Sequence, residues 1–383
     1  EYHDRQSRLA TRLLALNHTA FVAEPGPTLQ FLVGPSVAWH LSERPFLLIV
    51  TATSKVCFVF PTFEATRAME VLADAAVPLP LCARTWDEDG SAYEEVVRIL
   101  ADVGGVIALD PSARSFLRTG LGAMGLKVTP GAAVIEPLRA VKSRAEIAVL
   151  RRANELTKAA IAAAARAAEI GWTEDQLQKT VLAALARVGF TETWTLSLFG
   201  ANAAFPHGTL GGGGRLGDGG GTMVLIDAGG ALGIYQSDIS RSFWFGEVGG
   251  APQELKDAWE TVSKAQLAAL NAIAIGVECR AIDAAARNVI ATAGFGSGFE
   301  HFTHRLGHGI GLEGHEGPYI VGNNPTPLVP GMAFSLEPGI YSKGRFGIRI
   351  EDIVAIGEDG RVEVFGALST NLDDPFHGHS VIL

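Results

Sequence analysis

The sequence predicts two domains, an α/β domain over residues 1–135 and a larger α+β domain over residues 136–383. The chain of 383 residues is longer than most single domains, so two hydrophobic cores are expected. Apolar residues make up 48% of the chain and charged residues 19%, which is the balance of a folded globular protein. Near residue 136 the sequence changes from short alternating strands and helices to a long helix rich in alanine.

In the first domain, short apolar runs that are typical of strands alternate with segments of helical periodicity. Helices are expected over residues 4–16 and 93–102, and from Phe63 and Ser112 onward. Strands are expected over residues 19–22, 29–33, 46–50, 55–60 and 106–110. This alternation predicts an α/β unit.

The second domain begins with a helix predicted over residues 144–169. Thr173 is a suitable N-cap for a second helix over residues 173–188, because Gln176 follows three residues later and completes a capping box. A third helix is expected over residues 252–275, and strands over residues 222–227 and 243–246. These elements predict an α+β domain.

Charge and cysteine content limit the choice of partners and compartment. The formal net charge is −10, with 31 Lys and Arg against 41 Asp and Glu, so no basic surface for nucleic acid is expected. Three widely spaced cysteines suggest neither a disulfide framework nor a thiolate zinc cluster. No apolar run is long enough to span a membrane, and residues 1–5 lack the apolar core of a signal peptide. A soluble cytoplasmic protein is therefore expected.

Two aspartates in strand-like segments of the second domain are the first sign of a metal site. Asp227 ends the apolar run 223–226, and Asp238 follows eleven residues later. Two neighbouring antiparallel strands joined by residues 228–235 could hold both carboxylates side by side. Because adjacent carboxylates repel each other, this arrangement would require a cation.

Two glutamates and a histidine extend this acidic set. Glu337 and Glu351 lie in apolar strand-like segments, where an uncompensated charge is costly. Between the two pairs of acids, His304, His308 and His315 lie in a glycine-rich stretch. Each residue alone is more often a turn or surface residue than a ligand, but four carboxylates and one imidazole together suit two ions of Mn²⁺, Co²⁺ or Zn²⁺ that acidify a bridging water. The pattern predicts a hydrolytic metal centre.

The segments around these residues resemble the signature of the M24 pita-bread metallopeptidases, the superfamily of creatinase, prolidase, aminopeptidase P and methionine aminopeptidase. The segments that carry the resemblance are 225–229, 237–241, 307–311, 337–341 and 349–352. Residues 137–147 also resemble the junction between the two domains of prolidases and aminopeptidases P, whereas methionine aminopeptidases generally lack the first domain. The resemblance implies a pita-bread catalytic domain after a smaller creatinase-type domain, and it implies the metal ligands Asp227, Asp238, His308, Glu337 and Glu351.

The same resemblance implies hydrolysis of the Xaa-Pro peptide bond by a hydroxide that bridges the two metals, in a homodimeric enzyme. It implies that His207 lies near the substrate and that His315 contacts the scissile amide or the oxyanion. Glu337 would also carry a proton between the water and the leaving nitrogen. His304 would contact the carboxylate side of the substrate or support the site, and Arg349 would balance the carboxylates or hold a ligand.

Several alternatives remain open at this point. A proline dipeptidase needs a pocket that is closed beyond proline, whereas aminopeptidase P accepts longer peptides and needs that end open. The segment 315–318 reads more like a prolidase, so the dipeptidase is preferred. A non-catalytic binding protein and a metal-free creatinase-type hydrolase are disfavoured because all five ligand positions are retained.

Overall fold

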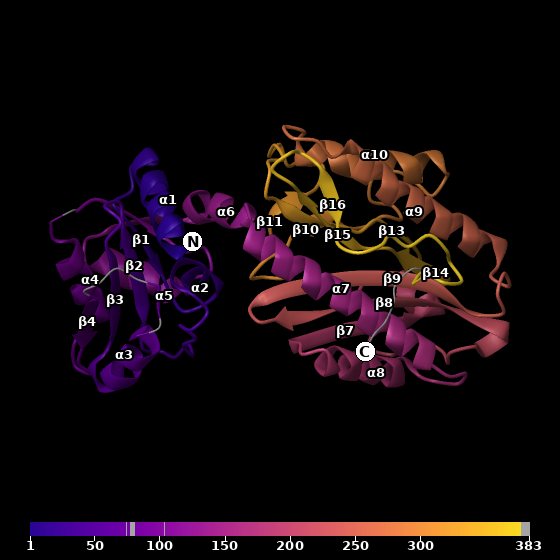
Figure 1. The fold of residues 1–383 in the computed structure, drawn as a ribbon, viewed down its shortest axis with the longest axis horizontal. Helices are drawn as coiled ribbons and strands as arrows, with labels where there is room; N and C mark the ends of the chain where they lie inside the picture. Colours follow the sequence, from indigo (N-terminus) through magenta and orange to yellow (C-terminus); the bar gives the residue numbers. More distant parts are fainter. Residues whose placement is uncertain (74, 77–80, 103, 377–383) are drawn as a thin grey trace. The chain divides into compact units, whose positions relative to one another are not determined.

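The computed structural model describes residues 1–73, 75–76, 81–102 and 104–376 of the chain (Figure 1). It divides into two compact units, Glu1–Arg139 and Ala140–Leu383. Helix α6 (Ala132–Ala140) ends the first unit, and the boundary expected between residues 135 and 136 falls inside this helix. In the described part of the chain, no helix combines the length and the apolar character that crossing a membrane requires.

The first unit is built on one mixed sheet of six strands in the order β4-β3-β2-β1-β5-β6. The strands are β1 (Ala20–Ala23), β2 (Leu47–Thr51), β3 (Val56–Pro61), β4 (Cys82–Trp86), β5 (Val106–Leu109) and β6 (Lys127–Pro130). The other helices are α1 (Tyr2–Ala15), α2 (Pro27–Val33), α3 (Ala65–Ala73), α4 (Ala92–Leu100) and α5 (Ser115–Ala123), with a 3₁₀ turn η1 (Thr62–Glu64). Buried aliphatic side chains of the central strands pack against α4 and α5, as expected for an α/β unit.

The prediction of a strand over residues 29–33 is wrong, because these residues belong to α2. Gly26 is the N-cap of this helix and Pro27 is its first residue, where a proline ring fits the helical backbone and no amide proton is needed. A short apolar run cannot be assigned to helix or strand by its periodicity alone. The Gly-Pro pair at its start is the sequence signal that identifies this segment as a helix.

The cysteine content suggests no disulfide framework, but the structure contains one disulfide. Cys57 of β3 and Cys82 of β4 are directly paired in the parallel register of these strands, and their sulfur atoms are bonded. The two residues are 25 positions apart, so their approach depends on the strand pairing and not on a local cysteine motif. Because disulfides are rare in cytosolic proteins, this bond removes the cysteine argument for a reducing compartment.

The second unit holds a three-stranded sheet, a five-stranded sheet and a hairpin. The three-stranded sheet contains β7 (Thr191–Phe199), β8 (Gly221–Leu232) and β9 (Tyr235–Gly246). The five-stranded sheet has the order β11-β10-β12-β15-β16, and the hairpin pairs β13 with β14. Their bounds are β10 (Gly307–Gly309), β11 (Glu316–Ile320), β12 (Ala333–Leu336), β13 (Gly339–Ser342), β14 (Phe346–Arg349), β15 (Asp352–Ile356) and β16 (Val362–Val364).

Two pairs of helices cover the outer faces of these sheets. Helices α7 (Arg144–Ala167) and α8 (Glu174–Arg187) pack on β8 and β9, and α9 (Gln253–Ala272) and α10 (Cys279–Thr292) pack on β12, β14 and β15 (Figure 1). Helix α8 begins with the predicted capping box of Thr173 and Gln176. The sheets therefore lie between two helical layers, and the residues of the predicted metal site lie on these strands or directly beside their ends.

Candidate metal centre

Asp227 and Asp238 come from the central hairpin of the second unit. In the antiparallel register, Asp227 of β8 is opposite Ser240, and Asp238 of β9 is opposite Gly229. The two aspartates are therefore diagonal neighbours, and both point to the same face of the sheet. Both are buried, and one oxygen of each lies within 4.8 Å of an oxygen of Glu351.

His308 is held in the middle of β10 by close backbone contacts on both sides. A Cβ atom at Gly307 would lie 1.9 Å from the carbonyl oxygen of Ser335, and one at Gly309 would lie 2.1 Å from that of Gly317. Only glycine fits at these two positions, so the glycines allow the strands on either side to approach His308. The Nδ1 atom of His308 lies 3.1 Å from the carbonyl oxygen of Gly309. A proton on Nδ1 would leave the lone pair of Nε2 free for a cation.

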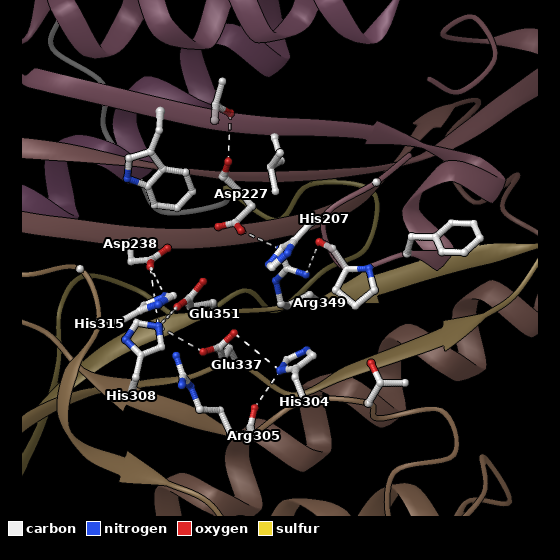
Figure 2. Close-up of a pocket in the computed structure, with 18 of the residues that line it drawn as sticks. His207, Asp227, Asp238, His304, Arg305, His308, His315, Glu337, Arg349 and Glu351 are labelled. Atoms are coloured by element: carbon white, nitrogen blue, oxygen red, sulfur yellow. Dashed lines mark hydrogen bonds and ion pairs between the residues drawn. The ribbon is translucent and has the colours of Figure 1, made fainter. Parts of the chain in front are cut away.

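The Nε2 atom of His308 faces three carboxylates. It lies 3.2 Å from Oε1 of Glu337, 3.7 Å from Oδ2 of Asp238 and 3.8 Å from Oε1 of Glu351. Glu337 follows β12 directly, and Glu351 lies between β14 and β15. Strands far apart in the sequence thus direct these groups at one point (Figure 2).

The protein itself supplies too few protons to satisfy these carboxylates. The Ser240 hydroxyl lies 3.0 Å from Oδ1 of Asp227 and 2.9 Å from Oε2 of Glu351, but it has one proton and can donate to only one of them. The same hydroxyl oxygen accepts a hydrogen bond of 2.8 Å from Nε of Arg349. The other oxygen of Glu351, Oε1, is buried and has no hydrogen-bond partner among the residues that the structure describes.

Burial and mutual repulsion shift the pKa values of this cluster. Burial, followed by the charges of Glu351, Asp227 and Glu337, raises the pKa of Asp238 well above its ordinary value. Burial and the charges of Glu337 and Asp227 likewise raise the pKa of Glu351. Burial also raises the pKa of Glu337, but its hydrogen bond to His308 and nearby positive charges outweigh burial and lower that pKa to about 2. Without a cation, the cluster binds protons in place of positive charge.

Arg349 lies beside this cluster, and four of its five N–H donors have partners within the protein. It is 3% exposed, and its guanidinium donates hydrogen bonds of 2.7 Å to Oδ2 of Asp227, 2.9 Å to the hydroxyl of Tyr341 and 3.1 Å to the carbonyl oxygen of Pro206. Burial lowers the pKa of Arg349, but Tyr341, Asp227 and Glu337 outweigh burial and raise it. Arg349 therefore stays charged and balances part of the acidic cluster.

His304 continues this hydrogen-bonded chain. Its Nε2 atom lies 2.8 Å from the hydroxyl of Tyr341, and its Nδ1 atom lies 2.7 Å from the carbonyl oxygen of Arg305. Because Arg349 donates to the Tyr341 oxygen, the hydroxyl proton is directed at His304 Nε2, and His304 Nδ1 carries the ring proton. Burial lowers the pKa of His304, so its ring is neutral at pH 7.

The other two predicted histidines are more exposed. His315 has a side chain that is 59% exposed, and its ring lies 4.0 Å from that of His308. Burial, with the charges of His308 and Arg305, lowers the pKa of His315 to about 4, so it is neutral at pH 7. His207 lies in an exposed loop after the 3₁₀ turn η2 (Gly200–Ala204).

The loop that carries His207 is anchored by a buried pair, Asn202 and Glu174. The Asn202 amide nitrogen donates to both carboxylate oxygens of Glu174, at 3.0 and 2.9 Å. Oδ1 of Asn202 accepts a hydrogen bond of 2.8 Å from the backbone of Thr209, and Glu174 accepts one of 2.8 Å from the backbone of Gly213. These bonds fix both ends of the segment around His207.

All nine of these candidate residues line one cavity of about 1170 Å³ (Figure 2). They are His207, Asp227, Asp238, His304, His308, His315, Glu337, Arg349 and Glu351. Apolar and aromatic side chains of Trp194, Leu196 and Phe205 line the same cavity. Sequence reasoning assigned no role to Ser240 and Tyr341, although both lie inside the family-like segments.

The donors present fit a divalent cation. Three overlapping sets of side chains could each hold an ion, with ligand atoms within 4.8 Å of one another: Asp227 with Asp238 and Glu351; His308 with Glu337 and Glu351; and Asp238 with His308 and His315. Carboxylate oxygens with one imidazole are ligands that Mn²⁺, Co²⁺ and Zn²⁺ accept. The unpartnered oxygen of Glu351 is the clearest sign that a positive charge belongs here.

Comparison with known proteins agrees with this geometry. A sequence profile of metallopeptidase family M24 matches residues 148–358, which include every candidate residue of the cavity. The chain belongs to metallopeptidase family M24. The predicted family and enzyme class are thereby confirmed, and a metal-dependent family is consistent with the unsatisfied carboxylates.

Relatives of this M24 peptidase match it over nearly its whole length. A probable dipeptidase PepE from Mycobacterium tuberculosis is 36% identical over 347 residues, or 90% of this chain and 88% of the relative. The crystal structure of dipeptidase PepE from Mycobacterium ulcerans has a TM-score of 0.85 and 32% identity, and the match covers 96% of this chain and 95% of that one. A prolidase from Thermococcus sibiricus has a TM-score of 0.82 and 25% identity, over 96% and 97% of the two chains. The match to both units confirms the predicted fold class.

Proposed function

We propose that this M24 peptidase is a Xaa-Pro dipeptidase that works with two divalent cations. The observation that carries this proposal is a cluster in which three carboxylates face Nε2 of His308 and a buried oxygen of Glu351 lacks a hydrogen-bond partner among the described residues, at the wall of a cavity. The similarity to a prolidase and to dipeptidases supports the substrate class. Asp227, Asp238, His308, Glu337 and Glu351 would hold the cations.

The cations would polarise the scissile carbonyl and lower the pKa of a water molecule, which makes hydrolysis feasible at neutral pH. Mn²⁺ and Co²⁺ are our first choices and Zn²⁺ is a further one, because all three accept these ligands.

Glu337 is the proposed general base and acid. Its hydrogen bond to His308 and nearby positive charges favour the ionised form of Glu337. A carboxylate in contact with the attacking water could accept its proton. It can then return that proton to the leaving nitrogen. Proline leaves as a secondary amine, which is a poor leaving group until it is protonated, so this transfer is necessary for the reaction.

The two remaining histidines of the cavity are proposed to contact the substrate. His315 lies beside His308 at the exposed side of the cluster, where an N–H group of its ring can donate to the developing oxyanion. His207 lines the cavity from the loop anchored by Asn202 and is proposed to contact the substrate near the scissile bond.

Arg349 and His304 are proposed as supporting residues. All three guanidinium nitrogens of Arg349 already donate within the protein, and both ring nitrogens of His304 are engaged. The ring nitrogens of His304 are therefore occupied, and four of the five N–H donors of Arg349 are used. Their hydrogen-bonded chain holds Asp227 and Tyr341 in position instead.

The test is hydrolysis of a matched pair of substrates, a Xaa-Pro dipeptide and a Xaa-Pro-Xaa tripeptide. Metal-free protein is resupplied with Mn²⁺, Co²⁺ or Zn²⁺, and His308→Ala serves as the control without the imidazole. Cleavage of the dipeptide alone supports the proposal, whereas efficient cleavage of the tripeptide would assign the protein to aminopeptidase P. Absence of metal-dependent cleavage of either peptide would refute both. The homodimer and the cytoplasmic location stay predictions.

A further inference from the structure

We propose that Arg305 binds the free α-carboxylate of the peptide substrate and so determines which peptides this M24 peptidase accepts. This inference rests on the proposed function, because it names the group that recognises one end of a peptide in the same cavity. Arg305 belongs to neither the metal-binding set nor the residues assigned to the reaction.

Arg305 and Arg349 are the two guanidinium groups that line the cavity in the described part of the chain, and they differ in availability. Arg349 donates to Asp227, Ser240, Tyr341 and a backbone carbonyl, so four of its five N–H donors are already used inside the protein. Arg305 is half-buried, and its guanidinium has no carboxylate or hydrogen-bond acceptor among the residues described in the structure. A cavity-lining cation without an anion is a candidate for a ligand's anion.

One face of the Arg305 guanidinium is already covered. Its central carbon lies over the ring of Tyr319 in β11, 4.6 Å from the ring centre. Stacking covers a face of the guanidinium and leaves its N–H edge free, which is the edge that binds a carboxylate with two parallel hydrogen bonds. The stack also restricts the side chain before binding, and this lowers the entropy lost when the ligand binds.

The position of Arg305 suits one end of a peptide. It follows His304 directly and precedes the metal-ligand candidate His308 by three residues, and Figure 2 shows it beside His308 and His304 in the close-up of the cavity. A peptide with its scissile bond at the cluster must place its terminal carboxylate away from the four acidic side chains, because like charges repel. Arg305 provides the available positive charge in this cavity to attract that carboxylate.

A purely structural role predicts a different result. If Arg305 only packs on Tyr319, its replacement would affect all substrates equally, because no substrate charge would be sensed. If it binds a carboxylate, its replacement would affect only substrates that carry one. The comparison of a dipeptide with its C-terminal amide therefore separates the two roles.

The experiment uses the full chain loaded with Mn²⁺ and compares Ala-Pro with Ala-Pro-amide in the wild type, Arg305→Met and Arg305→Lys. Methionine keeps an unbranched apolar stem over Tyr319 and removes the charge, whereas lysine keeps the charge without the planar fork. For Arg305→Met we expect kcat/KM on Ala-Pro to fall roughly 10- to 100-fold, mainly through KM, as for a lost charge-assisted hydrogen bond. We expect kcat/KM on the amide to stay unchanged, and Arg305→Lys to restore part of the loss.

The matched control is Arg345→Met, the same substitution at an exposed arginine that lies outside the cavity and pairs with Glu254. It should leave the ratio of the two substrates at the wild-type value. An equal loss on both substrates in Arg305→Met, or no loss on either, would overturn the inference while the proposed function stands. A wild-type protein that cleaves neither substrate with Mn²⁺, Co²⁺ or Zn²⁺ would instead refute the proposed function, and this inference with it.

Discussion

Glu351 and Asp352 are neighbours in the sequence, and both are buried, at 1% and 0% exposure. They differ in their partners, because only Asp352 forms ion pairs with buried cationic side chains. Oδ1 of Asp352 lies 2.5 Å from Nζ of Lys158 and 2.6 Å from a guanidinium nitrogen of Arg241. Its Oδ2 atom accepts a hydrogen bond of 3.0 Å from Gln266. Glu351 has no cationic partner of this kind, and its Oε1 atom has no hydrogen-bond partner among the residues described.

The pKa values of the two carboxyl groups are shifted in opposite directions. Burial raises the pKa of Asp352, but the charges of Arg241 and Lys158 outweigh burial and lower it. The pKa of Glu351 is raised by burial and by neighbouring carboxylates, with only partial relief from Arg349. A satisfied buried charge holds the fold together, whereas an unsatisfied one indicates a ligand that completes the site. We therefore propose that Glu351 belongs to a metal-binding part of this buried region and Asp352 to a structural part.

The largest expected effect is the loss of activity in Glu351→Gln. The substitution removes one proposed ligand charge, and the cations contribute several kcal/mol to the transition state, so kcat/KM should fall on the order of 10³-fold or more. The free energy of unfolding of the metal-free protein should not fall, because a repelled charge is removed. Steady-state kinetics with Mn²⁺ and urea unfolding after chelation measure the two effects. Activity close to wild type at saturating metal would contradict the assignment of Glu351 as a ligand.

Asp352→Asn should give the reverse result, with the larger effect on stability. Removing this carboxylate leaves Lys158 and Arg241 buried without their anion, which costs about 3–5 kcal/mol of unfolding free energy. Urea unfolding of the metal-free protein measures this loss. Asp359→Asn is the matched control, since its carboxylate pairs with Arg361 at the surface and should contribute less than about 1 kcal/mol. A similar effect of both substitutions would show that the buried cluster is not structural.

The sequence alone identified the unpaired acidic residues of this region but not the ion pairs of Asp352. Asp227, Asp238, Glu337 and Glu351 stand out because charged residues in apolar strands are costly, and the family-like segments surround each of them. Asp352 lies in the same kind of segment, but its partner Lys158 is almost 200 positions away on α7. No local pattern identifies such a pair.

The same limit explains the other differences between prediction and structure. The helix at 144–169 and the capping box at Thr173 were predictable, because helical spacing and capping are local properties. The Cys57–Cys82 bond and the position of Arg305 against Tyr319 depend on which strands become neighbours. Sequence therefore predicted residues with a local signal and missed those defined by tertiary contacts.

The pH dependence of stability should also distinguish the unpaired carboxyl groups from the paired one. Asp238 and Glu351 have folded-state pKa values above their unfolded ones, so the folded metal-free protein binds more protons at these positions. Its unfolding free energy should therefore decrease as the pH rises above about 4, by up to about 1.4 kcal/mol per pH unit for each group that stays protonated. The stabilisation that proton binding at these two groups provides is lost completely once the pH exceeds their pKa values in the folded protein.

Other groups titrate in the same pH range. The effect is therefore measured as the difference in unfolding free energy between the wild type and a variant that lacks both carboxyl groups. His315, with its pKa lowered to about 4, contributes the opposite slope below its unfolded pKa, because the unfolded state then binds more protons. Urea unfolding of the wild type and of Asp238→Asn/Glu351→Gln from roughly pH 5 to 8 isolates the two carboxyl groups. Added Mn²⁺ should stabilise the wild type more as the pH rises, since ligands bind metal in their deprotonated form. A constant difference between the two proteins across this range would contradict the prediction.

The smallest expected effect is at Ser240, whose hydroxyl connects Asp227, Glu351 and Arg349. Ser240→Ala should cost about 1 kcal/mol of unfolding free energy, as for one hydrogen bond, and should weaken Mn²⁺ binding roughly 10-fold because two proposed ligand carboxylates lose their orienting partner. Urea unfolding and calorimetric titration of the metal-free protein with Mn²⁺ measure these effects.

Ser242→Ala is a closely matched control for this last prediction. Ser242 lies two residues along the same strand and is equally buried, but its hydroxyl bonds only the backbone nitrogen and oxygen of Arg349, each at 2.9 Å. Both substitutions should therefore lower stability by similar amounts, while only Ser240→Ala should weaken the binding of Mn²⁺. Equal metal affinities in the two variants would mean that the Ser240 hydroxyl supports the fold and does not orient the proposed metal ligands. The metal-binding part of this region would then be limited to the proposed ligands themselves.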